Sequence, residues 1–112
     1  MLDAIEQAKK ESADLILFGE LASCGYPPRD FLEFEDFIQK SNTTIDALCA
    51  ASEDIAIVVG APSVNPVPEG KDLYNSAYFL HEKEIKHVQH KCLLPYRNLG
   101  FQCCCFIFRI NL

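Results

Sequence analysis

The sequence predicts an α/β fold, because helical and strand-like segments alternate along a chain of 112 residues. An amphipathic helical pattern over residues 2–12 precedes a short, largely apolar segment at 13–18, which is typical of a strand covered on both sheet faces. The same succession of helix and apolar strand returns between residues 31 and 59. The length fits one domain, since average domains have roughly 100–150 residues.

Each element in the first half follows from local composition. The first helix starts at Met1 with no Ser, Thr, Asp or Asn ahead of it, as expected for part of a longer element. Residues 19–30 are predicted to form a fixed loop, because Pro27-Pro28 excludes regular structure. Helical spacing returns over residues 31–52, with a break expected near Ser41-Asn42. The candidates for its buried stripe are Phe31, Phe34, Phe37, Ile38, Ile45, Leu48 and Cys49.

The next segments are a strand and a loop. Residues 55–59 form a second apolar strand, which we expect to end at Gly60-Ala61-Pro62. Residues 63–72 combine proline, glycine and polar side chains, a composition that predicts a surface loop.

The remaining segments predict a hairpin and an apolar end. Strands at 74–80 and 85–94, joined by residues 81–84, are expected to pair, because the side chains after residue 85 alternate with a period near two. The stretch 96–112 is apolar on consecutive positions, so we expect exposed apolar surface there or a strand at a sheet edge.

Composition excludes several classes of function. The chain has 16 acidic and 10 basic residues and a net charge of -6, which argues against binding to nucleic acids or anionic membranes. The longest apolar runs, residues 15–18 and 55–59, are far shorter than the ~20 residues of a membrane span. The first seven residues lack the basic and apolar regions of a signal peptide, so a cytoplasmic location is expected.

The six cysteines are predicted to be reduced. Three of them are consecutive, at 103–105, and no secretory signal precedes them. No C-x-x-C pair occurs, and the histidines lie in a segment with strand-like alternation, so no metal site is expected.

Two charged residues stand at predicted strand ends. Glu20 follows the first apolar strand, and open α/β sheets present functional groups at the carboxyl ends of their strands. Lys91 lies near the end of the last predicted strand. By position alone, such a Glu is more often a solvated or salt-bridged residue than a functional one, and an isolated Lys at a strand end is usually a solvated charge.

Two ordered motifs resemble the nitrilase, or carbon-nitrogen hydrolase, superfamily. The string A-D-L-I-L-F-G-E-L-A-S-C-G-Y-P-P-R-D at 13–30 is similar to its first signature, and H-K-C-L-L-P at 90–95 to its lysine signature. Between them, Gly60 and the Y-N-S-A string at 74–77 also resemble the family. The G-Y-P-P extension is similar to the glutaminase domain of glutamine-dependent NAD synthetases.

This resemblance implies a fold and a site. The fold would be a partial αββα sandwich, with residues 1–96 as part of the hydrolase domain and 97–112 as a divergent tail. Glu20 would be the general base that takes a proton from a cysteine thiol, and Lys91 the cation against the oxyanion. Tyr26 would line the glutamine pocket; a loop-anchoring aromatic is the alternative.

Departures from the family pattern bear on activity. The family carries a strand ahead of the first helix and proline where this chain has Gly19, and the match ends after Pro95. Its nucleophilic cysteine lies on a later strand, followed by acidic residues. None of the six cysteines fits that pattern, so the chain alone is expected to be inactive.

The resemblance also implies partners. Glutamine would be the substrate, and ammonia would pass to a synthetase domain that uses ATP and Mg to amidate deamido-NAD, within a homo-oligomer. No cofactor is expected in this segment. Two alternatives remain: another nitrilase-like amidase, and a non-catalytic α/β interaction module.

Overall fold

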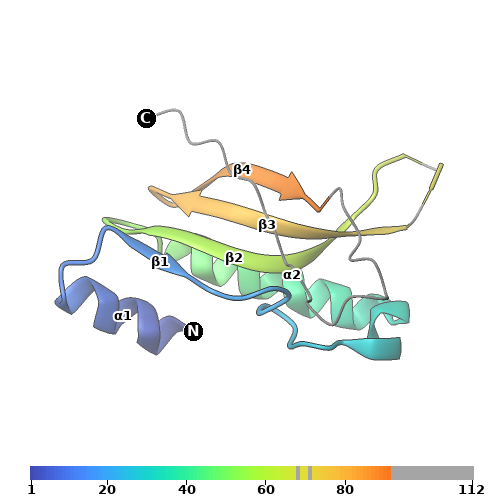
Figure 1. The fold of residues 1–112 in the computed structure, drawn as a ribbon, viewed down its shortest axis with the longest axis horizontal. Coiled ribbons are helices and arrows are strands. Elements are labelled where there is room, and N and C mark those ends of the chain that lie inside the picture. Colours follow the sequence, from blue (N-terminus) through green and yellow to red (C-terminus); the bar gives the residue numbers. More distant parts are fainter. Residues whose placement is uncertain (68, 71, 92–112) are drawn as a thin grey trace, which may run out of the picture.

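A four-stranded mixed sheet forms the centre of the molecule, in a computed structural model that describes residues 1–67, 69–70 and 72–91. Its strand order is β1-β2-β3-β4 (Figure 1). β1 (Leu15–Leu17) runs parallel to β2 (Ala56–Val64), whereas β3 (Leu73–His81) and β4 (Glu84–His90) pair antiparallel. This arrangement confirms the predicted α/β class.

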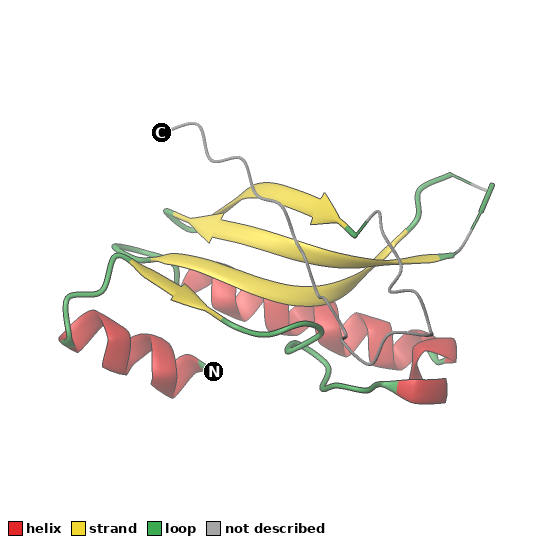
Figure 2. Ribbon diagram, in the orientation of Figure 1, coloured by secondary structure: helices red, strands yellow, loops and turns green. Residues whose placement is uncertain are grey.

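Two helices cover one face of this sheet (Figure 2). They are α1 (Leu2–Lys10) and α2 (Glu35–Ala50). α2 lies on the connection between β1 and β2, as parallel neighbours require a long crossover. The buried core residues of the helices and of the face they cover are Ile5, Ile45, Leu48, Ile55, Ile57, Val59, Ala61 and Leu80. Neither helix is both long enough and apolar enough to cross a membrane, within the part of the chain that the structure describes.

The second predicted helix differs from expectation in three respects. A 3-10 helix, η1 (Arg29–Glu33), comes first, and Phe34 adopts an extended conformation before α2 begins. Phe31 and Phe34 are 59% and 60% exposed, so their assignment to the buried stripe was wrong. No break occurs at Ser41, because this residue lies buried on α2 and its hydroxyl contacts that of Ser23 at 2.6 Å.

The prediction that the first strand is covered on both faces was wrong for β1. Leu15 and Leu17 are 49% and 70% exposed, while Ile16 between them packs against the core. Successive side chains of a strand point to opposite faces, and the described helices cover one face. Leu15 and Leu17 therefore lie on the opposite face, which we call the second face.

β2 extends five residues beyond its predicted end. It continues through Gly60 and Pro62 to Val64, and this extension pairs with β3 from Leu73 to Ala77. β1 ends opposite Val58, so within the described residues β2 has a neighbour on one side at Pro62, where a missing N–H is tolerated. Pairing with β3 therefore keeps residues 60–64 in the strand despite their glycine and proline.

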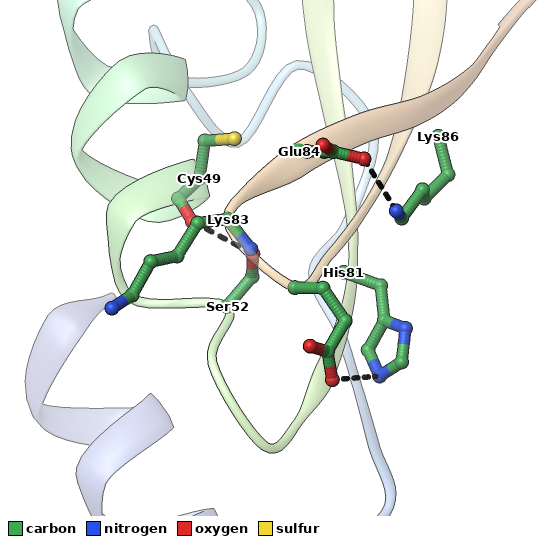
Figure 3. Close-up of polar contacts among 7 residues, drawn as sticks. Cys49, Ser52, His81, Lys83, Glu84 and Lys86 are labelled. Carbon is green, nitrogen blue, oxygen red and sulfur yellow. Dashed lines mark hydrogen bonds and ion pairs between the residues drawn. The ribbon is translucent and has the colours of Figure 1, made fainter.

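The predicted hairpin is confirmed and is tied to α2. Glu82 and Lys83 both have positive φ angles, 55° and 59°, as two-residue hairpin turns of type I′ require. The buried hydroxyl of Ser52, just after α2, accepts a hydrogen bond from the Lys83 amide at 3.1 Å and donates to the Cys49 carbonyl at 2.7 Å (Figure 3). β4 ends at His90; the rest of its predicted range, from residue 92, and the apolar stretch 96–112 lie outside the described residues.

Candidate functional site

Glu20 is carried by a turn that lies directly against β2 at Gly60. The Gly60 amide donates to the Gly19 carbonyl at 3.3 Å, and the Gly60 carbonyl accepts from the Ser23 amide at 3.1 Å. A Cβ atom on Gly60 would lie 2.5 Å from the Leu21 nitrogen and 2.8 Å from the Glu20 Cα. Glycine is therefore required for the turn to reach this position.

Lys91 reaches Glu20 from the other edge of the sheet. It follows β4, and its backbone N–H donates to the Asn75 carbonyl of β3 at 2.8 Å. Its Nζ lies 2.7 Å from Oε1 of Glu20, across 71 positions in the sequence. The Asn75 side chain donates from Nδ2 to the same carboxylate oxygen, at 2.5 Å. We call Glu20, Asn75 and Lys91 the charged cluster.

The ion pair in this cluster is largely withdrawn from water. The side chains of Lys91 and Glu20 are 7% and 10% exposed, so their attraction is little screened. A carboxylate held in this way can accept and return a proton, and an ammonium beside it can stabilise a negative charge that develops on a substrate oxygen. The arrangement thus combines a base with an electrostatic stabiliser.

A second polar cluster lies on the helix-covered face of the same strands. The hydroxyls of Ser63 and Ser76 are 2.6 Å apart, and the Ser76 hydroxyl lies 2.7 Å from Nδ1 of His90. The ring of Tyr74 packs on that of His90 with centroids 4.5 Å apart. Ser76 is fully buried, which does not suit a nucleophile that must reach a substrate. We call Ser63, Ser76 and His90 the serine-histidine cluster.

The two described cysteines have environments that favour the thiol form. Burial raises the pKa of Cys24, and its Sγ lies 3.5 Å from the Leu21 carbonyl. Burial and the charge of Asp46 raise the pKa of Cys49 on α2. The other cysteines, at 92 and 103–105, lie outside the described residues. Across the described ranges, no group of three His, Cys, Asp or Glu side chains is placed to hold a metal ion.

The structure brings together two of the three predicted site residues. Glu20 and Lys91 are in direct contact, as expected for two residues that the family resemblance assigns to one site. Tyr26 lies six residues further along the loop, 51% exposed, and its part in the site stays a prediction. An open hollow elsewhere, between the start of α1 and α2, is lined by Met1, Leu2, Asp3, Thr43, Thr44, Ala47 and Leu48.

Sequence reasoning missed Asn75 as a member of the site. It belongs to the Y-N-S-A string, but nothing in that string shows which residue opposes the segment after β4. The signal is the strand register: Ser76 pairs with His90, which places Asn75 beside Lys91.

Comparisons with known proteins identify the family of the chain. A family model described as carbon-nitrogen hydrolase matches residues 1–105. A glutamine-dependent NAD(+) synthetase from Synechocystis is 38% identical over 99 residues, covering 85% of this chain and 18% of the relative. One from Xylella fastidiosa is 37% identical over 92 residues, covering 81% and 16%. The chain thus spans less than a fifth of these relatives.

Two solved structures are similar in fold. A glutamine-dependent NAD+ synthetase from Acinetobacter baumannii, in complex with ADP, superposes with a TM-score of 0.68 at 33% identity over 89% of this chain and 18% of that one. One from Cytophaga hutchinsonii gives a TM-score of 0.73 at 23% identity, over 84% and 16%, and supports the fold alone. The fold of this chain therefore corresponds to part of these structures, as expected for a partial nitrilase-type fold.

Proposed function

Because the chain belongs to the carbon-nitrogen hydrolase family, we propose that it forms part of the glutaminase centre of a glutamine-hydrolysing NAD+ synthetase. The observation that carries the proposal is the buried contact of 2.7 Å between Glu20 and Lys91. Two residues 71 positions apart converge in this way because β1 ends opposite Val58 of β2 and β4 ends opposite Ser76 of β3, so that the segments after both strands meet over the central pair.

Glu20 is the general base of this proposal. Its carboxylate takes the proton of a cysteine thiol, and the thiolate attacks the carboxamide carbon of glutamine. When the carbon–nitrogen bond breaks, Glu20 returns the proton to the nitrogen, which leaves as ammonia. Water then hydrolyses the thioester to glutamate, with the carboxylate again as base.

Lys91 stabilises the negative charge in both steps. Its ammonium is held beside the carboxylate, where little water competes, so it is already oriented when the carbonyl oxygen becomes an oxyanion. Tyr26 is assigned to the wall of the glutamine pocket, because it lies in the loop that follows Glu20.

We expect the nucleophilic thiol to come from another segment. Cys24 and Cys49 have raised pKa values, which disfavours the thiolate, and Cys49 lies on α2. The triplet at 103–105 is followed by Phe106 instead of an acidic residue. The chain alone is thus expected to be inactive.

The remaining partners belong to the whole protein. Ammonia would pass to a synthetase domain that uses ATP and Mg²⁺ to amidate deamido-NAD, in a cytoplasmic homo-oligomer. The ADP bound to the Acinetobacter baumannii enzyme supports the nucleotide part of this assignment. Within the described residues, we assign no side chain to ATP or Mg²⁺.

A chimera tests the proposal. Residues 2–91 of this chain replace the matching segment of the Synechocystis synthetase, and NAD+ formation is measured with glutamine and with ammonia. We expect both activities in the chimera, whereas Glu20→Ala lowers the glutamine-dependent rate by about 100-fold or more and leaves the ammonia-dependent rate unchanged. Glu53→Ala, an exposed carboxylate, is the control and should change neither rate.

Other outcomes would contradict the proposal. A glutamine-dependent rate that survives Glu20→Ala would remove the general base. Hydrolysis of a different amide, with glutamine untouched, would favour another nitrilase-like amidase. A folded chimera that uses ammonia and never glutamine would favour a non-catalytic module.

A further inference from the structure

Asn75 touches both members of the ion pair. Its side-chain Nδ2 donates to Oε1 of Glu20 at 2.5 Å, and its backbone carbonyl accepts from the Lys91 amide at 2.8 Å. Lys91 Nζ reaches the same Oε1 at 2.7 Å. The carboxylate oxygen is therefore held between a charged donor from one segment and a neutral donor from β3.

The direction of the Asn75 amide is determined by the carboxylate. Its Oδ1 is buried and has no hydrogen-bond partner within the described part of the chain. Leaving a buried acceptor unpaired is unfavourable, and a rotated amide would instead place Oδ1 against Oε1 of Glu20, two acceptors in contact. In the observed orientation, the amide nitrogen donates to Glu20, and the amide oxygen has no partner among the described residues.

A neutral donor at this position has a specific advantage. Lys91 already supplies a positive charge, and a second cation would favour the ionised carboxylate so strongly that it would become a poor proton acceptor. An amide fixes the position of the carboxylate with a smaller effect on its basicity. It also adds no charge that would compete with Lys91.

We propose that Asn75 is the positioning residue of this site, which holds the Glu20 carboxylate against Lys91 in the geometry that proton transfer requires. That the geometry serves proton transfer rests on the proposed function. The contact between Asn75 and Glu20 is observed independently of it. Asn75 acts through Glu20, and the backbone bond to Lys91 couples its position to the cation as well.

The test is a pH titration of the Glu20 carboxyl carbon by NMR in the 112-residue chain. Removal of a donor to the ionised carboxylate should raise the midpoint in Asn75→Ala by about one pH unit. Asn75→Asp keeps the side-chain volume and replaces the donor by a second carboxyl group, so the upward shift should be larger. This isosteric variant is the measurement that counts if Asn75→Ala does not fold.

The matched control is Ser76→Ala, the next residue of the same strand. Ser76 is more deeply buried and bonds His90 on the helix-covered face, away from Glu20. It should leave the Glu20 midpoint where it is in the parent chain. Equal shifts in the two alanine variants would reduce Asn75 to a general structural role, and an unchanged midpoint in both Asn75 variants would overturn the proposal.

This experiment separates the inference from the proposed function. It needs no nucleophile and no turnover. A chimera without glutaminase activity, together with a shifted midpoint in the Asn75 variants, would contradict the proposed function alone. An active chimera with an unshifted midpoint would contradict the role of Asn75 alone.

Discussion

The charged cluster and the serine-histidine cluster lie on opposite faces of the same part of the sheet. Asn75 and Lys91 belong to the first, and their immediate neighbours Ser76 and His90 belong to the second. Both clusters are held by short hydrogen bonds. The difference is that the serine-histidine cluster is built within the sheet, whereas the charged cluster needs a turn from outside it, delivered over Gly60.

That difference explains which cluster is suited to chemistry. In the serine-histidine cluster, Ser76 is completely buried, whereas His90 on the outer strand β4 is exposed. The charged cluster joins a loop to the sheet beyond the carboxyl end of β1, the place where open α/β sheets present functional groups. Because successive side chains of β3 point to opposite faces, Asn75 belongs to the candidate active site and the next residue, Ser76, belongs to the serine-histidine cluster.

The largest effect is expected when the charged cluster loses its cation. Lys91→Met leaves the carboxylate of Glu20 buried without its ammonium, and breaking a buried pair costs about 3 kcal/mol of the free energy of unfolding. The measurement is urea denaturation followed by circular dichroism. Ser76→Ala, which removes a neutral hydroxyl from the other cluster, should cost about 1 kcal/mol.

A double variant provides the control for the ion pair. Glu20→Gln combined with Lys91→Met removes both charges and should recover much of the lost stability, because no unpaired charge remains buried. If Lys91→Met and Ser76→Ala lowered the free energy of unfolding equally, the charge of the first cluster would make no difference to stability, and the prediction would be wrong.

The next effect concerns the turn that delivers Glu20. Gly60→Ala places a Cβ atom 2.7 Å from the Gly19 oxygen and 2.8 Å from the Glu20 Cα, so backbone must move, at a cost of about 2 kcal/mol. Gly19→Ala is the matched control, since a Cβ there meets no atom within 4 Å. Thermal unfolding of the two variants measures the difference, and similar midpoints would contradict the contact of the turn with β2.

The sequence was sufficient for the elements whose signals are local. Helical spacing located α1 and α2, and alternation located the β3–β4 hairpin. The fates of Phe34 and Leu17 were not predictable in this way, because exposure depends on which face other elements cover. Likewise, Pro62 lies inside β2 for a reason outside its own segment, namely that β1 ends opposite Val58.

The residues of the candidate site also fall into those with a local signal in the sequence and those whose role depends on other elements. Glu20 and Lys91 stand out in the sequence, because each is a charge at the end of an apolar or alternating strand and each lies in a family motif. Asn75 lies in the Y-N-S-A string but carries no charge, and its role depends on the register between β3 and the segment after β4. Gly60 was noticed as a strand terminator, but its function is to admit the backbone of the turn.

An exposed ion pair provides the smallest effect and the sharpest contrast with the buried one. Lys83 Nζ lies 2.8 Å from Glu53 Oε2, with side chains 53% and 59% exposed. The hydrogen bond and the charge of Lys83 lower the pKa of Glu53 below 4.5, so this pair contributes stability above about pH 4.5 that is lost as the pH falls through the lowered pKa. Glu53 conversely raises the pKa of Lys83 above 10.5, so the contribution is also lost at strongly alkaline pH.

Lys83→Met should therefore lower the unfolding midpoint slightly near pH 7, and this difference should shrink as the pH falls through the lowered pKa of Glu53. Added salt should abolish the small difference at neutral pH, because water and ions screen an exposed pair. The Lys91→Met difference should persist in the same salt, since the side chains of that pair are about nine-tenths buried. If the two differences were equally sensitive to salt, the Glu20–Lys91 pair would be as accessible to solvent as the Glu53–Lys83 pair. The proposal that Glu20 transfers protons in a site with little water would then be contradicted.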